Sequence, residues 1–357
     1  MNYAVIMAGG SGTRFWPVSR NQSPKQFLPI ANPKPMIVAT VDRLAPLFSP
    51  DRIFVVGNEG HRELLSRQLN GIPPNQILLE PFGRNTAAAI GLAAIHLSTH
   101  DPDSVMVVLP SDHLIGKASE FIGLLDQAIR LAKAEPHALL TIGLKPTRPE
   151  TGYGYLQLDE DIRIDGFPSA YHVKTFAEKP NYETAVRFFE AGDFTWNSGM
   201  FIWRTQAILE AFQRYMPDLY EELMILKSAI RTPDYQDALL GAYSRMPNTS
   251  IDYGVMEKAD LVLALRADIG WSDVGSWDEV AGLTPIGEDG NAGSSDRIAW
   301  QSTGNLVQAS KLVALVGVDD LIVIESDDAI LICKKGESQK VKNVVDQLKL
   351  RNKTSYL

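Results

Sequence analysis

Residues 3–28, YAVIMAGGSGTRFWPVSRNQSPKQFL, set the pattern from which the rest of the chain can be interpreted. The apolar run at residues 3–8 predicts a short buried strand. A loop that contains Gly9, Gly10 and Gly12 follows it directly. Because glycine adopts positive φ and lets the backbone approach a ligand closely, such a loop can direct several N–H groups at one anion.

Two cations accompany this loop, and they strengthen the prediction of a phosphate-binding site. Arg14 and Lys25 would add full positive charge beside the backbone N–H donors, so both are candidate catalytic residues. The predicted nucleotide-binding residues of the loop are Gly9, Gly10, Ser11, Gly12 and Thr13. The structural alternative is a tight turn between a strand and a helix, which also needs glycine.

The loop differs from two widespread phosphate-binding motifs. No Lys-Ser/Thr pair follows its glycines, so it is not GxxxxGK[ST], and Phe15 stands where GxGxxG needs Gly or Ala. Trp16 and Pro17 prevent a smooth helix directly after the loop, whereas dinucleotide-binding loops lead into a helix that holds the pyrophosphate. The sequence therefore predicts a phosphate cradle of another kind.

The elements GTR, WP and SPKQF complete a family signature. With GGSGTRFWPVSR…PKQFLP, the chain resembles the sugar-nucleotide pyrophosphorylases, and it is similar to their mannose-1-phosphate guanylyltransferase branch over residues 3–350. The resemblance implies the nucleotide-diphospho-sugar transferase fold, GTP and mannose 1-phosphate as substrates, Mg²⁺ as cofactor, and a homodimer. Larger relatives carry a further C-terminal β-barrel with isomerase activity, and from its length we expect this chain to be a single-activity form.

Composition excludes several other classes of protein. The net charge of −9 leaves no basic footprint at the level of the whole chain, so nucleic acid is not an expected partner. The single cysteine, Cys333, cannot form an internal disulfide and is expected in the core, which suits a reducing cytoplasm. No segment approaches the ~20 apolar residues of a membrane helix. We therefore expect a cytoplasmic protein without a membrane partner.

Apolar runs alternate with helical spacing in the first part of the chain, which predicts an α/β protein. The expected strands are 3–8, 52–56, 76–79, 105–109 and 139–142, and the expected helices are 86–98 and 121–134. This rhythm predicts a Rossmann-like mixed, mostly parallel sheet covered on both faces. Ligands of such sheets bind at the carboxyl ends of the strands.

The later part of the chain changes character twice. Residues 150–204 alternate like antiparallel strands around a cleft, and a helical stretch with proline breaks follows at 206–243. A segment rich in Gly, Ser and Asp then precedes short β-rich runs. We predict a catalytic domain over 1–289 and a small β-helix-like domain with a terminal helix over 290–357.

Two aspartates are candidate ligands of Mg²⁺, which prefers carboxylate and phosphate oxygens. Asp112 of LPSDH follows a predicted strand, although it could equally cap the following turn, and His113 is expected to be structural because imidazole is a poor ligand of Mg²⁺. Asp273 of GWSDVGSW precedes a helix whose predicted caps are Ser276 or Asp278. Only the resemblance pairs Asp112 with Asp273, as metal ligands and catalytic residues.

Five segments in one order match the family's sugar-phosphate site: ETGYGY, FAEKP, WNSGMF, SIDYGVMEK and GWSDVGSW. Each segment alone has a structural alternative, such as glycines in a turn, an exposed Glu-Lys pair or an asparagine in a turn before a strand. The predicted sugar-phosphate-binding residues are Gly152, Tyr153, Glu178, Lys179, Asn197 and Asp252.

The base pocket is predicted from EPFGRNTAAAI, residues 80–90, with Glu80, Asn85 and Thr86 as nucleotide-binding residues. Guanine presents N–H donors, so an acceptor such as Glu80 would select it, while Asn85 could instead cap the following helix. Ala88 departs from the family, where proline is usual.

Two other functions fit parts of this sequence. One is another hexose-1-phosphate nucleotidyltransferase that uses UTP or dTTP with glucose 1-phosphate. The other is a catalytically silent sensor of nucleotide sugars. The presence of Arg14, Lys25, Asp112 and Asp273 argues against a sensor, because sensing needs neither a site for a leaving phosphate nor metal-binding carboxylates.

Overall fold

The structure is a computed structural model that describes residues 1–10, 12–162, 164–293 and 296–357. The chain divides into two units, and each takes up segments that are far apart in the sequence. The first unit comprises Met1–Gly9, Val41–Ser111 and Ile115–Trp271, and the second comprises Gly10–Thr40, Asp112–Leu114 and Ser272–Leu357. Helix α1 (Met36–Leu44) and the short strands β5 (Leu114–Ile115) and β11 (Trp271–Ser272) lie where the chain passes from one unit to the other.

A nine-stranded sheet with the order β3-β2-β1-β4-β9-β6-β10-β8-β7 forms the centre of the first unit. Its strands are β1 (Asn2–Ala8), β2 (Ile53–Asn58), β3 (Ile77–Glu80), β4 (Val105–Pro110), β6 (Leu139–Leu144), β7 (Tyr155–Asp159), β8 (Ala170–Ala177), β9 (Phe194–Arg204) and β10 (Val262–Ala267). Strands β8 and β9 run antiparallel to their neighbours, and the other pairs are parallel. The predicted mixed, mostly parallel sheet is confirmed.

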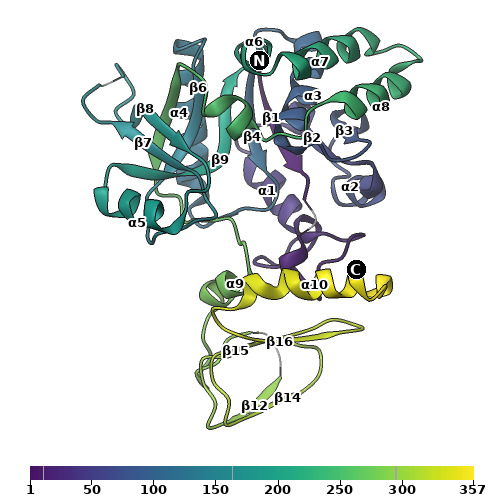
Figure 1. The fold of residues 1–357 in the computed structure, drawn as a ribbon, viewed down its shortest axis with the longest axis vertical. Coiled ribbons are helices and arrows are strands. Elements are labelled where there is room, and N and C mark those ends of the chain that lie inside the picture. The colour runs from purple at the N-terminus through teal and green to yellow at the C-terminus, as the bar shows by residue number, and fades with distance from the viewer. Residues whose placement is uncertain (11, 163, 294–295) are drawn as a thin grey trace. The chain divides into compact units, whose positions relative to one another are not determined.

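Helices complete the first unit (Figure 1). They are α2 (Arg62–Gln68), α3 (Asn85–His100), α4 (Ala118–Ala134), α5 (Tyr182–Ala191), α6 (Thr205–Tyr215), α7 (Pro217–Ala229) and α8 (Tyr235–Arg245). Most of them pack on this sheet, whereas α7 and α8 pack on other helices. Helix α3 is rich in alanine and buried along most of its length, and it packs against α6 and α7. At Gly91 a Cβ atom would lie 2.6 Å from Leu223 Cδ1, so the small residue permits this close helix packing.

Two details of residues 150–204 differ from the prediction. Helix α5 interrupts the expected run of antiparallel strands; Asn181 caps it by accepting a hydrogen bond from the Thr184 N–H at 2.9 Å. Asn197 lies inside β9 rather than before it, because this strand already begins at Phe194.

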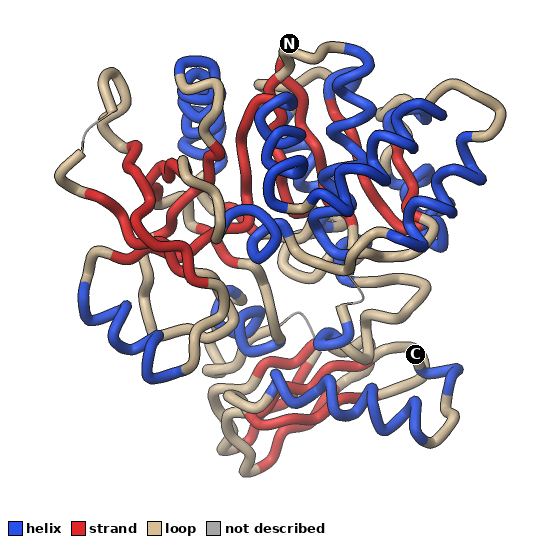
Figure 2. The backbone as a smooth tube through the Cα atoms, turned by 45° about the horizontal axis from the view of Figure 1, so that its top comes forward, coloured by secondary structure: helices blue, strands red, loops and turns tan. Residues whose placement is uncertain are grey.

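The second unit carries the C-terminal strands. These are β12 (Arg297–Trp300), β13 (Leu306–Gln308), β14 (Val313–Val316), β15 (Leu321–Glu325) and β16 (Ile330–Lys334), and the helices are α9 (Trp277–Leu283) and α10 (Val341–Leu350). β12 pairs in parallel with β14, and β13 in parallel with β15, so strands that alternate in the sequence lie side by side. Figure 2 shows α10 beside these strands, and its Val341 and Val345 belong to the same apolar core as Ile322 and Ile324 of β15.

Gly10–Thr40, which includes the signature loop after Gly9, belongs to the second unit as well. Phe15 and Trp16 are buried in one core with Val274 and Trp277, and the Phe15 and Trp277 rings meet edge to face at 5.2 Å. Hydrophobic packing therefore anchors the residues that flank the glycine-rich loop. Among the described residues, none of the helices combines the length and the apolar character that crossing a membrane requires.

Candidate active site

A cavity of about 280 Å³ in the second unit collects most of the predicted phosphate- and metal-binding residues. Its lining consists of Gly10, Gly12, Thr13, Arg14, Phe15, Lys25, Asp112, His113, Asp273, Val274 and Gly275. Three distant segments of the chain thus meet at one place. Of the remaining loop residues, Gly9 belongs to the first unit, and Ser11 lies outside the residues that the structure describes.

The backbone of the loop requires its glycines. Gly10 and Gly12 have φ angles of 102° and 57°, in the region that disfavours other residues. A Cβ atom on Gly12 would lie 2.8 Å from both Cβ and N of Lys25, so the loop can approach this lysine only because Gly12 has no side chain. Ser19 Oγ donates a hydrogen bond to the Gly12 carbonyl at 2.5 Å and fixes the same turn.

Lys25 joins the two aspartate-bearing segments of the cavity. Its Nζ donates to Asp112 Oδ2 at 2.8 Å, to the Asp112 carbonyl at 3.0 Å and to the Asp273 carbonyl at 2.6 Å. The side chain is buried, being 7% exposed. Burial of Asp112 opposes ionisation, but the Lys25 ammonium and then His113 outweigh it, so the pKa of Asp112 lies below its usual range. Asp112 is therefore a carboxylate at neutral pH.

The loop that carries Asp273 is shaped by a residue that the sequence analysis did not single out. Glu279 Oε2 accepts hydrogen bonds from the Gly275 N–H at 2.7 Å and from Ser272 Oγ at 3.1 Å. The spacing of Ser276 and Glu279 is that of a capping box, which is the signal that could have revealed this role.

Of the two predicted caps of helix α9, Ser276 occupies the N-cap position, but its side chain makes no capping hydrogen bond. Asp278 instead accepts hydrogen bonds from the N–H groups of Gly336 and Ser338, so it ties α9 to the segment before α10.

The predicted sugar-phosphate residues lie in the first unit, and several of them contact one another. Asn197 Nδ2 donates to Asp252 Oδ1 at 2.9 Å, and Asn197 Oδ1 accepts from Thr141 Oγ1 at 2.8 Å. Lys179 and Glu178 form an ion pair of 2.7 Å. Burial and then the nearby Glu178 raise the pKa of Asp252 to about 6. Thr141, a buried residue of β6, was missed because nothing in a strand sequence distinguishes it.

The glycines and the tyrosine of TGYGYL have different surroundings. The Gly152 N–H donates to Glu150 Oε1 at 3.0 Å, while the Tyr153 ring lies 5.1 Å from Trp196 and 5.3 Å from Trp271. At Gly154 a Cβ atom would lie 2.5 Å from Glu178 Oε2. Gly154 therefore leaves the space that the Glu178 carboxylate occupies.

The predicted base-binding residues also lie in the first unit. Asn85 does not cap α3; it adopts φ of 68° as the first helical residue, and its Oδ1 accepts from the Thr86 N–H at 2.9 Å. Thr86 Oγ1 accepts from the Ile251 N–H at 2.9 Å. Glu80 is only 6% exposed beside the buried Tyr243, and burial raises the pKa of this carboxyl to about 7.

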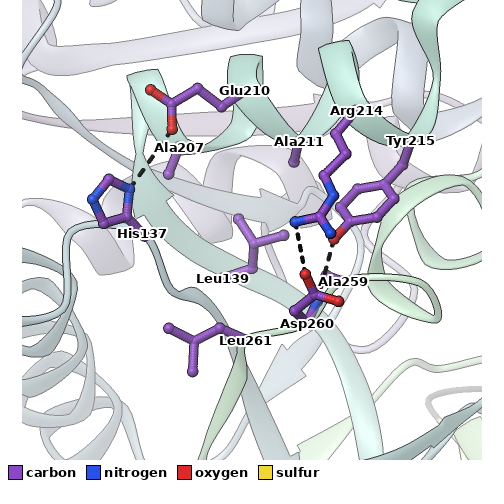
Figure 3. Close-up of a pocket in the computed structure, with 10 residues that line it drawn as sticks. All are labelled: His137, Leu139, Ala207, Glu210, Ala211, Arg214, Tyr215, Ala259, Asp260 and Leu261. Atoms are coloured by element: carbon purple, nitrogen blue, oxygen red, sulfur yellow. Dashed lines mark hydrogen bonds and ion pairs between the residues drawn. The ribbon is translucent and has the colours of Figure 1, made fainter.

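A separate cavity of about 370 Å³ in the first unit lies at the amino ends of β6 and β10 (Figure 3). Its polar side chains pair with one another, as in Arg214 with Asp260 at 2.6 Å and His137 with Glu210 at 3.7 Å. Sheets of this kind bind ligands at the opposite, carboxyl ends of their strands. We therefore do not include this cavity in the candidate site.

Two family profiles match the chain. A profile described as Nucleotidyl transferase matches residues 3–285, and one described as MannoseP isomerase/GMP-like beta-helix domain matches residues 295–348. The chain belongs to the nucleotidyl transferase family. The predicted enzyme class is confirmed, and so is the α/β fold followed by a β-helix domain.

Individual relatives agree with the family. The chain is 40% identical over 355 residues to mannose-1-phosphate guanylyltransferase of Escherichia coli (strain K12), which covers 97% of this chain and 73% of that protein. It is 39% identical over 348 residues to Xanthan biosynthesis protein XanB of Xanthomonas campestris pv. campestris (strain B100), with coverage of 97% and 73%. A solved structure described as mannose-1-phosphate geranyltransferase from Thermus thermophilus matches with a TM-score of 0.87 and 33% identity, covering 98% of this chain and 99% of that one. The predicted resemblance to the guanylyltransferase branch is confirmed.

Proposed function

We propose that this nucleotidyl transferase family member transfers GMP from GTP to mannose 1-phosphate, forming GDP-mannose and releasing pyrophosphate. One observation carries the proposal. A glycine-rich loop, an arginine and two aspartates line one cavity in a chain that is 40% identical to a mannose-1-phosphate guanylyltransferase along almost its whole length.

The reaction needs positioning and charge neutralisation rather than a covalent intermediate. An oxygen of the mannose 1-phosphate attacks the α-phosphorus of GTP, and the bond from this phosphorus to the bridging oxygen of pyrophosphate breaks. Both reactants are anions, so the enzyme must hold them together against their repulsion. A phosphate monoester is already largely ionised at neutral pH, so the attacking group needs no general base.

We assign the leaving phosphates of GTP to the loop in the second unit. The amides of Gly10, Gly12 and Thr13 would donate to phosphate oxygens, and Arg14 would add a fixed positive charge. Gly9 and Ser11 remain predicted members of the same cradle. Arg14 is exposed, and its guanidinium donates to a neutral amide, Gln339 Oε1 at 3.3 Å, so its charge is not neutralised by this contact.

The residues of the cavity fit Mg²⁺. Asp112 and Asp273 both line this cavity, and the low pKa of Asp112 keeps its carboxylate ionised. At Gly275 a Cβ atom would lie 3.0 Å from Asp273 Oδ2, so the missing side chain leaves room beside this carboxylate. Mg²⁺ usually takes one or two carboxylates together with phosphates and water, which agrees with a site of two aspartates. When bound, the ion would neutralise negative charge on phosphate oxygens.

We assign the sugar phosphate to the residues in the first unit. Glu178 and Asp252 supply acceptors for sugar hydroxyl groups, and Lys179 supplies a cation for the phosphate. Asn197 is held by Thr141 and Asp252, so its amide is oriented before any sugar binds. Gly152 and Tyr153 remain predicted contacts of the same ligand.

We assign the guanine base to the region of Glu80, Asn85 and Thr86 in the first unit. Because burial raises the pKa of Glu80 to about 7, the side chain can be a carboxylate, which only accepts hydrogen bonds, or a protonated acid, which also donates one. Guanine needs acceptors for its N–H groups, so the ionised form is the one that would select it.

Pyrophosphate release, measured with each of GTP, ATP, UTP and dTTP against mannose 1-phosphate and glucose 1-phosphate, tests the proposal. We expect Mg²⁺-dependent release that is fastest with GTP and mannose 1-phosphate. Faster release with UTP or dTTP and glucose 1-phosphate would favour the other hexose-1-phosphate nucleotidyltransferases. Tight binding of GDP-mannose without release from any pair would identify a sensor.

We also propose a homodimer. On the paired strands β12 and β14, Ile298 and Trp300 are exposed beside Ala314 and Val316, and Ile330 is exposed on β16. Such an apolar surface is typical of a subunit contact. Sedimentation equilibrium tests the assembly, and Trp300→Lys should give monomers if this surface forms the contact.

A further inference from the structure

Lys25 has no N–H group left for a phosphate in the arrangement that the structure shows. A lysine ammonium has three donors and no acceptor. Its three acceptors here are Asp112 Oδ2, the Asp112 carbonyl and the Asp273 carbonyl, all within 3.0 Å. The ammonium also lies 5.6 Å from the centroid of the buried Phe15 ring. This saturated environment differs from that of Arg14, the other cation of the cavity.

The position of Lys25 is determined by more than these bonds. Lys25 is the first residue of the short helix η2 (Lys25–Phe27), and its backbone lies against Gly12. The side chain is buried, being 7% exposed, so little of it is open to competing water. Because Asp112 is ionised, the pair between them is a charge-assisted hydrogen bond in a partly dry site, which is stronger than a surface ion pair.

We propose that Lys25 is a positioning residue that ties the two aspartate-bearing loops together and withholds the Asp112 carboxylate from a divalent cation until a phosphate ligand is present. The metal part of this inference rests on the proposed function, since it takes Asp112 as a ligand of Mg²⁺. A divalent cation at Asp112 would lie next to an ammonium that shares the same oxygen, and the two positive charges repel. Phosphate oxygens would offer the ammonium other acceptors and would bind the metal themselves.

The consequence is cooperative binding. If the phosphate ligand releases the Asp112 oxygen from Lys25, the nucleotide raises the affinity for the metal, and the metal must raise the affinity for the nucleotide by the same factor. The two carbonyl contacts, which a metal does not need, can persist and keep the two loops together. Lys25 would therefore suppress metal binding to the free enzyme.

Binding of Mn²⁺ alone, measured by the electron paramagnetic resonance signal of the free ion, tests the inference. We expect Lys25→Met to bind Mn²⁺ at least ~10-fold more tightly than the wild type, because a hydrogen bond to a charged group has a net value that corresponds to a factor of ten or more. Disruption of the fold would weaken binding, so it cannot imitate this gain.

Matched variants separate the effect of breaking the Lys25–Asp112 pair from the effect of removing a positive charge from the cavity. Arg14→Met removes a cation from the same cavity without breaking a bond to Asp112, so its gain should be much smaller. The double variant Asp112→Asn/Lys25→Met should lose the tighter Mn²⁺ binding that Lys25→Met alone gains. Equal or weaker Mn²⁺ binding by Lys25→Met, or an equal gain in Arg14→Met, would overturn the inference. If the double variant still bound Mn²⁺ as tightly as Lys25→Met does, Asp112 would not be a metal ligand, and the inference would fail.

A measurement on the wild type does not depend on whether Lys25→Met folds. In protein labelled with ¹³C at lysine Cε, the Lys25 signal can be assigned by its loss in Lys25→Arg. We expect Mn²⁺ alone to leave this signal sharp and Mn²⁺ with GTP to broaden it. Equal broadening by Mn²⁺ alone would contradict the inference, whereas failure of the proposed function would appear separately, as absence of pyrophosphate release.

Discussion

Replacing Glu80 by glutamine should stabilise the protein in a way that depends on pH. Glu80 ends β3, is 6% exposed and lies beside Tyr243, whose side chain is fully buried. Burial penalises the ionised carboxylate most, although Tyr243 and the backbone of Arg84 partly compensate, and the pKa of Glu80 rises from 4.5 to about 7. Glutamine has the shape of the protonated acid and stays neutral at every pH.

The size of the effect follows from the two pKa values. Each pKa unit corresponds to about 1.4 kcal/mol, so the difference amounts to about 3 kcal/mol. The pKa is higher in the folded state, so the folded protein binds the proton more tightly than the unfolded chain does. The wild type therefore has this stabilisation in full below pH 4.5 and loses it as the pH rises through about 7. Glu80→Gln should match the wild type near the acid limit and exceed it by about 3 kcal/mol above the folded pKa.

Urea unfolding of both proteins across this pH range measures the difference. Other titrating groups, such as Asp252, are the same in both chains and cancel. Glu63→Gln, at an exposed position of α2, is the matched control for the substitution itself and should change the free energy of unfolding by less than ~0.5 kcal/mol. If the difference in the free energy of unfolding between Glu80→Gln and the wild type stayed constant with pH, the reasoning would be refuted. It would mean that Glu80 is not a buried carboxyl group that ionises as the pH rises.

Three further predictions concern the site. Asp112→Asn and Asp273→Asn should each abolish turnover with an unchanged far-UV circular dichroism spectrum, and near-normal turnover would remove that residue from the chemistry. Gly12→Ala should destabilise the protein by about 2 kcal/mol in urea unfolding. A residue other than glycine in the left-handed conformation costs about 1–2 kcal/mol, and the new Cβ would lie 2.8 Å from Lys25. Unchanged stability would count against this close contact. Gly154→Ala should displace the Glu178 carboxylate, which would lie 2.5 Å from the new Cβ. The loss of one charged hydrogen bond should then raise the KM for mannose 1-phosphate roughly tenfold without changing the KM for GTP. Equal increases in both KM values would argue against a sugar-specific role for Glu178.

Local patterns in the sequence predict most strands and helices because each depends on neighbouring residues. The apolar run at 3–8 is β1, and the prolines at 217 and 233 separate α6, α7 and α8 as expected. Helix α5 was missed although its signals are local. Asn181 is its N-cap, and Gly192 ends it in the left-handed conformation.

The contacts of the site could not be predicted from spacing. Asp112 and Asp273 are brought to one cavity by tertiary packing, and only the family resemblance paired them beforehand. The three bonds of Lys25 depend on two carbonyl groups whose directions no side-chain pattern reveals. Cys333, expected in the core, is half-buried, because the side chains of edge strand β16 alternate between the core and the surface.

A crystal structure with GTP and Mg²⁺ tests the central claim most directly. We predict that the β- and γ-phosphates of GTP accept hydrogen bonds from the amides of Gly10, Gly12 and Thr13, and that the metal is bound by Asp112 and Asp273. A triphosphate that lies away from this loop, with neither aspartate on the metal, would contradict the account.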